Sequence, residues 1–272
     1  MQAAWTFRLA QGLRGEIDTM RISPIVLLLV AMLGCGLESQ TANESDSKAQ
    51  EQDVETNVEN KSSPATLAVE PVETREQAIA VIKKMGGKVT FDEMKPDRPV
   101  ERINFSRSEI TDAGLEHLKG LTSLQTLKLN DTQITDAGLE HLKGLTELKY
   151  LNVNETKITD TGLMYLKGLT NLQGLDLTDT TITDAGLEHL KGLTKLFWLQ
   201  LAFTNVTDEG LKHLKEMTIL KILDLSFTNI TDEGLEHLKG LTKLQLLNLN
   251  DKVTDEGVQK LRQALPNCEI NH

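Results

Sequence analysis

Histidine is the residue with the most suggestive spacing in this 272-residue chain. Five of the six histidines recur at one position of a regular series, in which Tyr165 replaces the third member: His117, His141, His189, His213 and His237. A metal site would need neighbouring imidazoles to converge on one ion at bonds of about 2 Å. Most of these histidines lie in Glu-His-Leu-Lys segments, which are typical of a solvated helix flank. We therefore expect a structural role, with no metal and no cofactor.

An aspartate recurs with the same period and is the second candidate for chemistry. Its members are Asp112, Asp136, Asp160, Asp184, Asp208, Asp232 and Asp255, each preceded by a threonine. Aspartate and threonine are both preferred as helix N-caps, so that either Thr111 or Asp112 is a suitable cap in the first unit. Because every unit needs a cap, we interpret this column as structural and not as catalytic.

Other constellations that would indicate an enzyme or a nucleic-acid binder are missing from the sequence. There is no glycine-rich phosphate loop, no nucleophile elbow, and no histidine outside the column except His272. The net charge is −11, and no basic stripe exists that could displace phosphate counterions. We expect a protein that is not an enzyme and does not bind nucleic acid. A site built from acidic side chains is the remaining enzymatic alternative.

Cys35 is the residue with the clearest covalent chemistry. A charge-free run of twelve residues, 22–33, spans only about 18 Å as a helix, which is shorter than the ~30 Å hydrocarbon core of a bilayer. A basic residue, Arg21, precedes the run, as in secretory signals. The segment Ala31-Met-Leu-Gly-Cys35 resembles the lipobox of bacterial lipoproteins, which implies cleavage after Gly34 and acylation of Cys35. The alternatives are a plain secretory signal and a transmembrane anchor.

These features predict four parts of the chain. Residues 1–34 form a lipoprotein signal peptide, whose true start is either Met1 or Met20, and residues 35–73 form an acidic, disordered tether behind the lipidated cysteine. Residues 74–99 form an N-terminal cap, with a capping box at Thr74–Gln77, a helix, and a short strand at 88–91. Residues 100–270 form a repeat domain. Acylation would hold the mature protein on a membrane, outside the inner membrane and preferably on an outer membrane.

The repeat determines the expected fold. The string Ile-Thr-Asp-x-Gly-Leu recurs at residues 110, 134, 158 and 182, with variants at 206 and 230, always 24 residues apart. Each unit continues with Leu-x-x-Leu-x-Leu-x-x-Thr. This pattern resembles the leucine-rich repeat, and it is similar to a bacterial relative of the cysteine-containing subclass with Thr in place of Cys, as in repeat lipoproteins of planctomycete-type bacteria. The resemblance implies an α/β solenoid: a curved horseshoe with a parallel concave sheet and short helices on the convex face.

The repeat geometry assigns a role to each recurring position of the unit. Leu-x-Leu is a strand with alternate side chains inward. Leu115, Leu118 and Leu121 lie on the buried side of a short helix. A threonine column faces inward at the bend after each strand, where its hydroxyl satisfies backbone groups: Thr132, Thr156, Thr180, Thr204 and Thr228. The last units are atypical, as solenoid ends require, and Cys268 is interpreted as a small buried residue of that end.

The free positions of the sheet are the candidate binding surface. Adjacent strands lie about 4.8 Å apart, so equivalent outward residues of successive units touch. The candidate partner-binding residues are Trp198, Phe203, Phe227, Ile222, Leu246, Tyr150 and Phe197, bordered by Asp176, Asp179 and Asp224. An exposed aromatic patch with a polar rim is typical of a binding site. The alternatives are that these rings only stack on one another, or that random sequence drift at exposed strand positions placed them there.

Two functions remain after these exclusions. The first is a non-enzymatic, lipid-anchored recognition module of the cell envelope, whose concave face binds a protein or peptide. The second is an envelope structural or glycan-contacting module, in which Trp198 and the two phenylalanines are sugar platforms and the aspartates accept hydroxyl hydrogen bonds. No sequence feature identifies the ligand.

Overall fold

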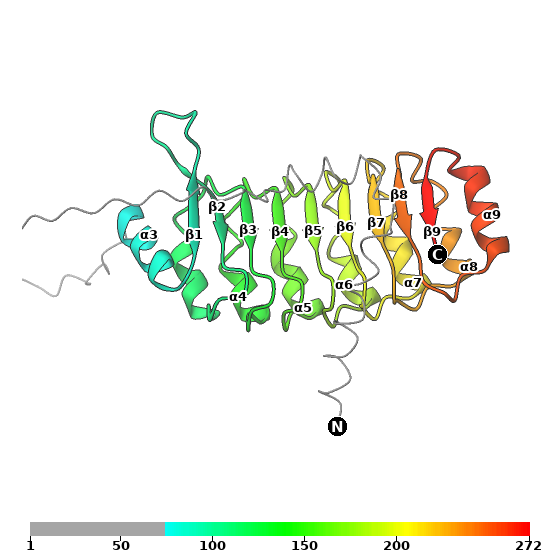
Figure 1. Ribbon diagram of the computed structural model, residues 1–272, viewed down its shortest axis with the longest axis horizontal. Helices are drawn as coiled ribbons and strands as arrows, with labels where there is room; N and C mark the ends of the chain where they lie inside the picture. Colours follow the sequence, from blue (N-terminus) through cyan, green and yellow to red (C-terminus); the bar gives the residue numbers. More distant parts are fainter. Residues whose placement is uncertain (1–73) are drawn as a thin grey trace, which may run out of the picture. The chain divides into compact units, whose positions relative to one another are not determined.

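The computed structural model describes residues 74–272. The predicted signal peptide, Cys35 and the predicted tether lie outside these residues. The described chain is a row of nine strands in sequence order, with helices in the connections (Figure 1). The first strand pairs antiparallel and every later neighbour pairs parallel. None of the helices in this part of the chain is long and apolar enough to cross a membrane.

The strands are short and evenly spaced along the sequence. Their bounds are β1 Lys88–Phe91, β2 Val100–Asn104, β3 Thr126–Lys128, β4 Tyr150–Asn152, β5 Gly174–Asp176, β6 Trp198–Gln200, β7 Ile222–Asp224, β8 Leu246–Asn248 and β9 Glu269–Asn271. The parallel register advances by one repeat from strand to strand, for example Leu151 opposite Leu175 and Leu175 opposite Leu199. Equivalent residues therefore form columns across the sheet.

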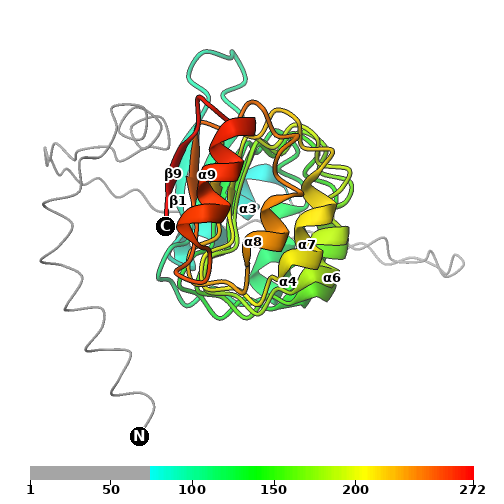
Figure 2. The same ribbon diagram turned by 90° about the vertical axis from the view of Figure 1, so that its right-hand side faces the viewer.

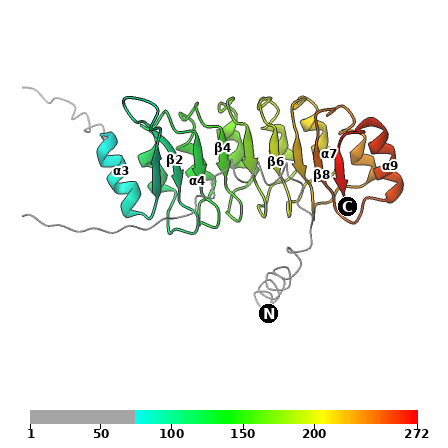
Figure 3. The ribbon, with the colours of Figure 1, turned by 45° about the horizontal axis from the view of Figure 1, so that its top comes forward.

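Helices occupy the opposite side of the row, as the end view shows (Figure 2). The α-helices are α3 Arg75–Lys84, α4 Asp136–Glu140, α5 Asp160–Leu163, α6 Asp184–Glu188, α7 Asp208–Leu211, α8 Asp232–Leu235 and α9 Asp255–Ala264. The 3-10 helices are η2 Ala113–Leu118, η3 Met164–Leu166 and η4 Lys212–Leu214. The longer helices α3 and α9 lie at the two ends of the row (Figure 3). Two surfaces result, which we call the sheet face and the helix face.

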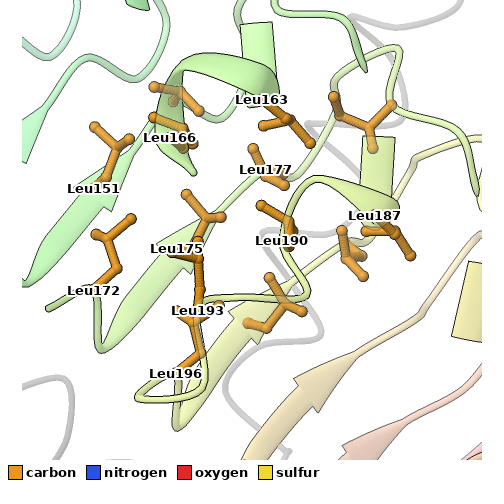
Figure 4. Close-up of a cluster of buried hydrophobic side chains, with 14 of the residues drawn as sticks. Leu151, Leu163, Leu166, Leu172, Leu175, Leu177, Leu187, Leu190, Leu193 and Leu196 are labelled. Atoms are coloured by element: carbon orange, nitrogen blue, oxygen red, sulfur yellow. The ribbon is translucent and has the colours of Figure 1, made fainter. Parts of the chain in front are cut away.

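The core between the two faces is mostly leucine, with isoleucine and valine as the main other residues (Figure 4). Leu175 of β5, Leu187 of α6 and Leu193 of the following turn are each 0% exposed. Each such leucine packs between the units before and after it, so that the hydrophobic effect joins repeats that would be too small to fold alone. The predicted inward positions Leu115, Leu118 and Leu121 are buried as expected.

The N-terminal helix begins at the predicted capping box. The hydroxyl of Thr74 accepts a hydrogen bond from the backbone N–H of Gln77, and the Gln77 side chain accepts one from the backbone N–H of Thr74. Ala78 and Ile82 are the buried residues of α3. The helix therefore covers the apolar end of the first repeat.

Threonine, and not aspartate, is the N-cap residue of the helices α4 to α9. The side chains of Thr135, Thr159, Thr183, Thr207, Thr231 and Thr254 each accept a backbone N–H of the following helix. The aspartate that follows each threonine is the first helical residue. Only the first unit differs: Asp112 precedes η2 and makes no capping hydrogen bond.

The aspartate instead binds the next repeat. Asp184 accepts the backbone N–H of Thr207 at Oδ1 (2.8 Å) and the hydroxyl of Thr207 at Oδ2 (2.6 Å). The same two bonds form from Asp112, Asp136, Asp160, Asp208 and Asp232 to the threonine of the following unit. We call this series the Asp–Thr ladder. It explains the glycine of the motif, because a Cβ on Gly210 would lie only 2.4 Å from Asp184 Oδ1.

The inward threonine column also behaves as predicted. The hydroxyl of Thr180 donates to the carbonyl of Leu177 at 2.6 Å, and its equivalents at 132, 156, 204 and 228 do the same to the residue three positions earlier. The last unit has Asn250 near this place. Its buried amide donates to Thr228 Oγ1 and to the carbonyl of Ile230.

Candidate functional site

The sheet face carries three columns of residues that the core does not use. The first column is Arg102, Thr126, Tyr150, Gly174, Trp198, Ile222 and Leu246, and the second is Asn104, Lys128, Asn152, Asp176, Gln200, Asp224 and Asn248. The third lies in the turn after each strand and is Arg107, Asp131, Glu155, Asp179, Phe203, Phe227 and Asp251. Every candidate sheet-face residue except Phe197 belongs to one of these columns.

The first column holds an aromatic pair that is seated on a glycine. A Cβ on Gly174 would lie 2.8 Å from Tyr150 Cδ1 and 2.8 Å from Trp198 Cε3, so both rings lie against the space that a side chain would fill. Phe197 meets Tyr150 edge to face, with ring centroids 6.3 Å apart. Sequence analysis did not assign a role to Gly174. The signal was available, since it is the one position in that column without a side chain.

The apolar residues that were expected to form one continuous exposed group differ in their exposure. Trp198 and Leu246 are half-buried, whereas Ile222 between them is only 5% exposed. Ile222 lies between Trp198 and Leu246 across the sheet and offers little surface to a partner, so its role in binding stays a prediction. The solvent-exposed aromatic residues of the sheet face are Phe203 and Phe227.

The second column contains two groups of side-chain hydrogen bonds between neighbouring strands. Asn152 donates to Asp176 Oδ2, and Asn248 donates to Asp224 Oδ2, each at 3.1 Å. With its amide oriented to suit its neighbours, Gln200 accepts from Trp198 Nε1 at 3.0 Å and donates to Asp224 at 3.2 Å. This bond fixes the tryptophan ring in place.

Asp176 is not a rim residue, in contrast to the expectation from sequence. It is 8% exposed and accepts the backbone N–H of Thr178. Burial, and to a lesser degree the charge of Asp224, raises the pKa of Asp176 above its ordinary value, although the bonds from Thr178 oppose the shift. Asn104 and Asn152 close the same local turn with an amide oxygen. The negative charge at this position is therefore not required by the fold.

The third column has a left-handed backbone in six successive units. The φ angles at Arg107, Asp131, Glu155, Asp179, Phe203 and Phe227 lie between 52° and 59°. Aspartate tolerates this conformation because its short polar side chain bonds locally, whereas bulky residues rarely adopt it. The fold would thus be served better by aspartate at positions 203 and 227. Sequence analysis did not predict this strain.

The two phenylalanines stack and remain open to solvent. Their ring centroids are 4.2 Å apart and the planes are within 11° of parallel. Phe203 is nevertheless 50% exposed and Phe227 67% exposed. The stack therefore covers one face of each ring and leaves the rest of the apolar surface exposed to solvent. Both rings stand at left-handed backbone positions, which are energetically unfavourable for phenylalanine. We call this pair the phenylalanine stack.

Charge is distributed unevenly along the sheet face. Arg107 forms an ion pair with Asp131 at 3.5 Å near the N-terminal end. Further along the column, burial and the neighbouring charges of Asp131, Asp179 and Asp176 raise the pKa of Glu155, and Arg107 only partly offsets them. The middle of the sheet face is therefore a region of negative potential next to the phenylalanine stack.

The histidine column is half-buried, which corrects the expectation of a fully solvated flank. The Nδ1 atoms of His141 and His189 are enclosed. Burial, with the charges of Lys191 and Lys212, lowers the pKa of His213. Within residues 74–272 no group of three or more His, Cys, Asp or Glu side chains is placed to hold a metal. Cys268 is half-buried, and burial raises its pKa to about 11, which favours the protonated thiol over the nucleophilic thiolate.

The row of parallel strands and its repeating connections define the class of fold as a leucine-rich repeat solenoid. Residues 146–206 match a family described as Leucine rich repeat, residues 122–165 match Leucine Rich repeats (2 copies), and residues 216–239 match Leucine Rich repeat. These matches agree with the predicted repeat.

Two solved bacterial structures are similar to the chain. Internalin C2 of Listeria monocytogenes has a TM-score of 0.53 and 28% identity, over 71% of this chain and 80% of that one. A leucine-rich repeat protein of Leptospira interrogans has a TM-score of 0.45 and 22% identity, over 58% of this chain and 45% of that one. A comparison with curated protein sequences gave no match.

Proposed function

We propose that this chain is a non-enzymatic recognition protein that binds a protein or peptide on its sheet face. Leucine-rich repeats commonly serve as protein-recognition modules, and the chain carries such repeats. The observation that carries the proposal is the phenylalanine stack: two half-exposed rings at left-handed positions where aspartate would suit the fold. A few large residues near the centre of a protein interface carry most of the binding energy, and aromatic side chains are frequent among them.

We further propose that Cys35 anchors the protein to the cell envelope of a bacterium. The support is the lipobox-like segment before Cys35 and the absence of charge in residues 22–33. Gly36 is not the aspartate associated with retention at the inner membrane, which favours the outer membrane. The sequence also supports the Thr-containing relative of the cysteine-containing repeat subclass. Intact-mass analysis of the protein and of Cys35→Ser tests the anchor, and an unacylated N-terminus in the unaltered protein would overturn it.

Affinity capture tests the proposed recognition function. Detergent-solubilised envelope is passed over the protein, and bound partners are compared with those of Trp198→Ala and Phe227→Ala. Each substitution is expected to weaken the partner by at least about 2 kcal/mol while the melting temperature changes little. Glu188→Gln on the helix face is the control. Loss of the partner in the control alone would move the site to the helix face, and retention on purified cell-wall polysaccharide without a protein partner would favour a glycan-contacting module.

A further inference from the structure

We propose that the partner presents a cationic segment, an extended polypeptide with arginine or lysine side chains, to the middle of the sheet face. One cationic side chain lies between the outer face of Phe203 and the carboxylate of Asp179, with Glu155 beside it. This inference rests on the proposed recognition function and adds the chemistry of the partner.

The first argument is the charge of the three columns. From β4 to the turn after β7 these columns contain four carboxylates and no lysine or arginine: Glu155, Asp176, Asp179 and Asp224. The basic residues of the columns are confined to β2, β3 and the turn after β2, where Arg102 pairs with Glu101 and Arg107 with Asp131. A partner that crosses these three columns in the middle of the sheet face therefore meets carboxylates with no lysine or arginine among them.

The second argument is that this charge is unfavourable in the unbound protein. Burial and three neighbouring carboxylates raise the pKa of Glu155, and Asp176 is held in a buried position where Asn152 shows that an amide would suffice. A cation placed between these groups relieves the repulsion, because opposite charges attract strongly where water is partly excluded. Binding of a cation is therefore favoured, because it supplies the positive charge that these carboxylates lack in the unbound protein.

The third argument is the position of the phenylalanine stack. In the third column the order is Asp179, Phe203, Phe227, so the face of Phe203 that does not meet Phe227 is directed toward Asp179. A cation over an aromatic face is attracted by the ring quadrupole, and arginine is favoured because its planar guanidinium both stacks and pairs with carboxylates. Within the described residues, cations already lie over Phe91 and Tyr165, whereas none is found over this stack.

Other partner classes fit these observations less well. A neutral glycan can donate hydroxyl hydrogen bonds to these carboxylates but leaves their charge in place, and anionic lipid or nucleic acid is repelled by them. An apolar helix would cover the phenylalanine stack but would bury Asp179 and Glu155 without a partner, which is costly. An extended cationic segment satisfies both the rings and the carboxylates.

The test uses three peptides that differ only in charge. A peptide of alternating Arg and Ser places every arginine on one side of an extended chain. A second peptide has citrulline, which is neutral and nearly isosteric, at each arginine, and a third has glutamate. Binding to the full-length protein is measured by calorimetry at low and at physiological salt. The arginine peptide is expected to bind at least about tenfold more tightly than the citrulline peptide, and the glutamate peptide not at all.

Variants locate the binding. The double substitution Glu155→Gln and Asp179→Asn is expected to weaken the arginine peptide about tenfold and to leave the citrulline peptide unchanged. Phe203→Ala is expected to weaken both. The matched control is Glu140→Gln with Glu188→Gln, which removes the same charge from the helix face, where these residues pair with Lys143 and Lys191. Thermal melting of each variant confirms folding.

The outcomes separate this inference from the proposed function. Equal binding of the arginine and citrulline peptides, or an equal loss in the helix-face control, overturns the cationic partner. If envelope capture still depends on Trp198 and Phe227, the sheet face remains the recognition surface and only its charge preference is wrong. If neither capture nor peptide binding depends on sheet-face residues, both proposals fail.

Discussion

The helix face and the sheet face use the same 24-residue unit in opposite ways. On the helix face, threonine and aspartate recur in nearly every unit, and each aspartate is bonded twice to the next repeat. On the sheet face, the first and third columns change from unit to unit, from Arg102 to Trp198 and from Asp131 to Phe227. The difference teaches that the repeated residues of the Asp–Thr ladder hold neighbouring units together, whereas the varied columns of the sheet face contain the residues that are exposed for contact.

The largest expected effect on stability comes from the leucine core, which lies between the sheet face and the helix face. Leu175→Ala removes a side chain that is 0% exposed and packed between two units. It is expected to destabilise the protein by about 2–5 kcal/mol, because a cavity remains in the middle of the core. Urea denaturation followed by circular dichroism measures the change. A loss below that of the surface substitutions would contradict the assignment of the leucine core.

Breaking one rung of the Asp–Thr ladder tests the helix face directly. Asp184→Ala leaves the N–H and hydroxyl of Thr207 without their acceptor, which is expected to cost about 1–3 kcal/mol. Glu209→Ala, an exposed acidic residue on the neighbouring helix, is the control and is expected to change stability by less than about 0.5 kcal/mol. If both variants melted at the same temperature, the ladder would have no role in joining the repeats.

The sheet face is expected to respond to pH through Asp176. Burial raises the pKa of this group above 3.8 in the folded protein, so its contribution to stability is present in acid and is lost as the pH rises through the folded-state value. Asp176→Asn removes that loss. The stability of the variant relative to the unaltered protein should therefore increase with pH in denaturation series from acid to neutral pH. A relative stability that fell with pH would reverse the assigned sign.

The smallest expected effect is at the histidine column. His189→Gln is expected to change the free energy of unfolding by no more than about 0.5 kcal/mol, because the enclosed Nδ1 of His189 has no hydrogen-bond partner that the substitution would remove. The thermal melt of this variant sets the baseline for the helix face. A loss as large as that of Leu175→Ala would show that the column does more than flank the helices.

The sequence was sufficient for the fold because the hydrophobic pattern repeats with one period. Leucine at fixed offsets specifies strand, turn and short helix in every unit, and the inward threonines follow from the need to satisfy the backbone at the bend. The capping box at Thr74–Gln77 was predictable for the same reason, since it depends on local spacing alone.

The details of the site were less predictable because they depend on contacts between units. The left-handed backbone under Phe203 follows from the geometry of the turn, and no pattern within one repeat reveals it. Burial of Ile222 depends on its two neighbours across the sheet. The hydrogen-bond partner of Asp184, Thr207, lies 23 residues away in the sequence. The motif glycine, of which Gly210 is one member, was the sequence signal of this close contact, because a side chain there would clash with the aspartate.

The Asp–Thr ladder also bears on how the length of such a protein can change. Each rung joins the aspartate of one unit to the threonine of the next, so excision of a whole unit leaves no rung without a partner. If residues 158–181 were removed, Asp136 would meet Thr183 in place of Thr159, and Tyr150 would lie beside Trp198. The phenylalanine stack would then move one strand closer to the basic end. Loss or gain of a whole repeat can therefore rearrange the contact surface in a single step, because each unit carries both the aspartate and the threonine of the ladder.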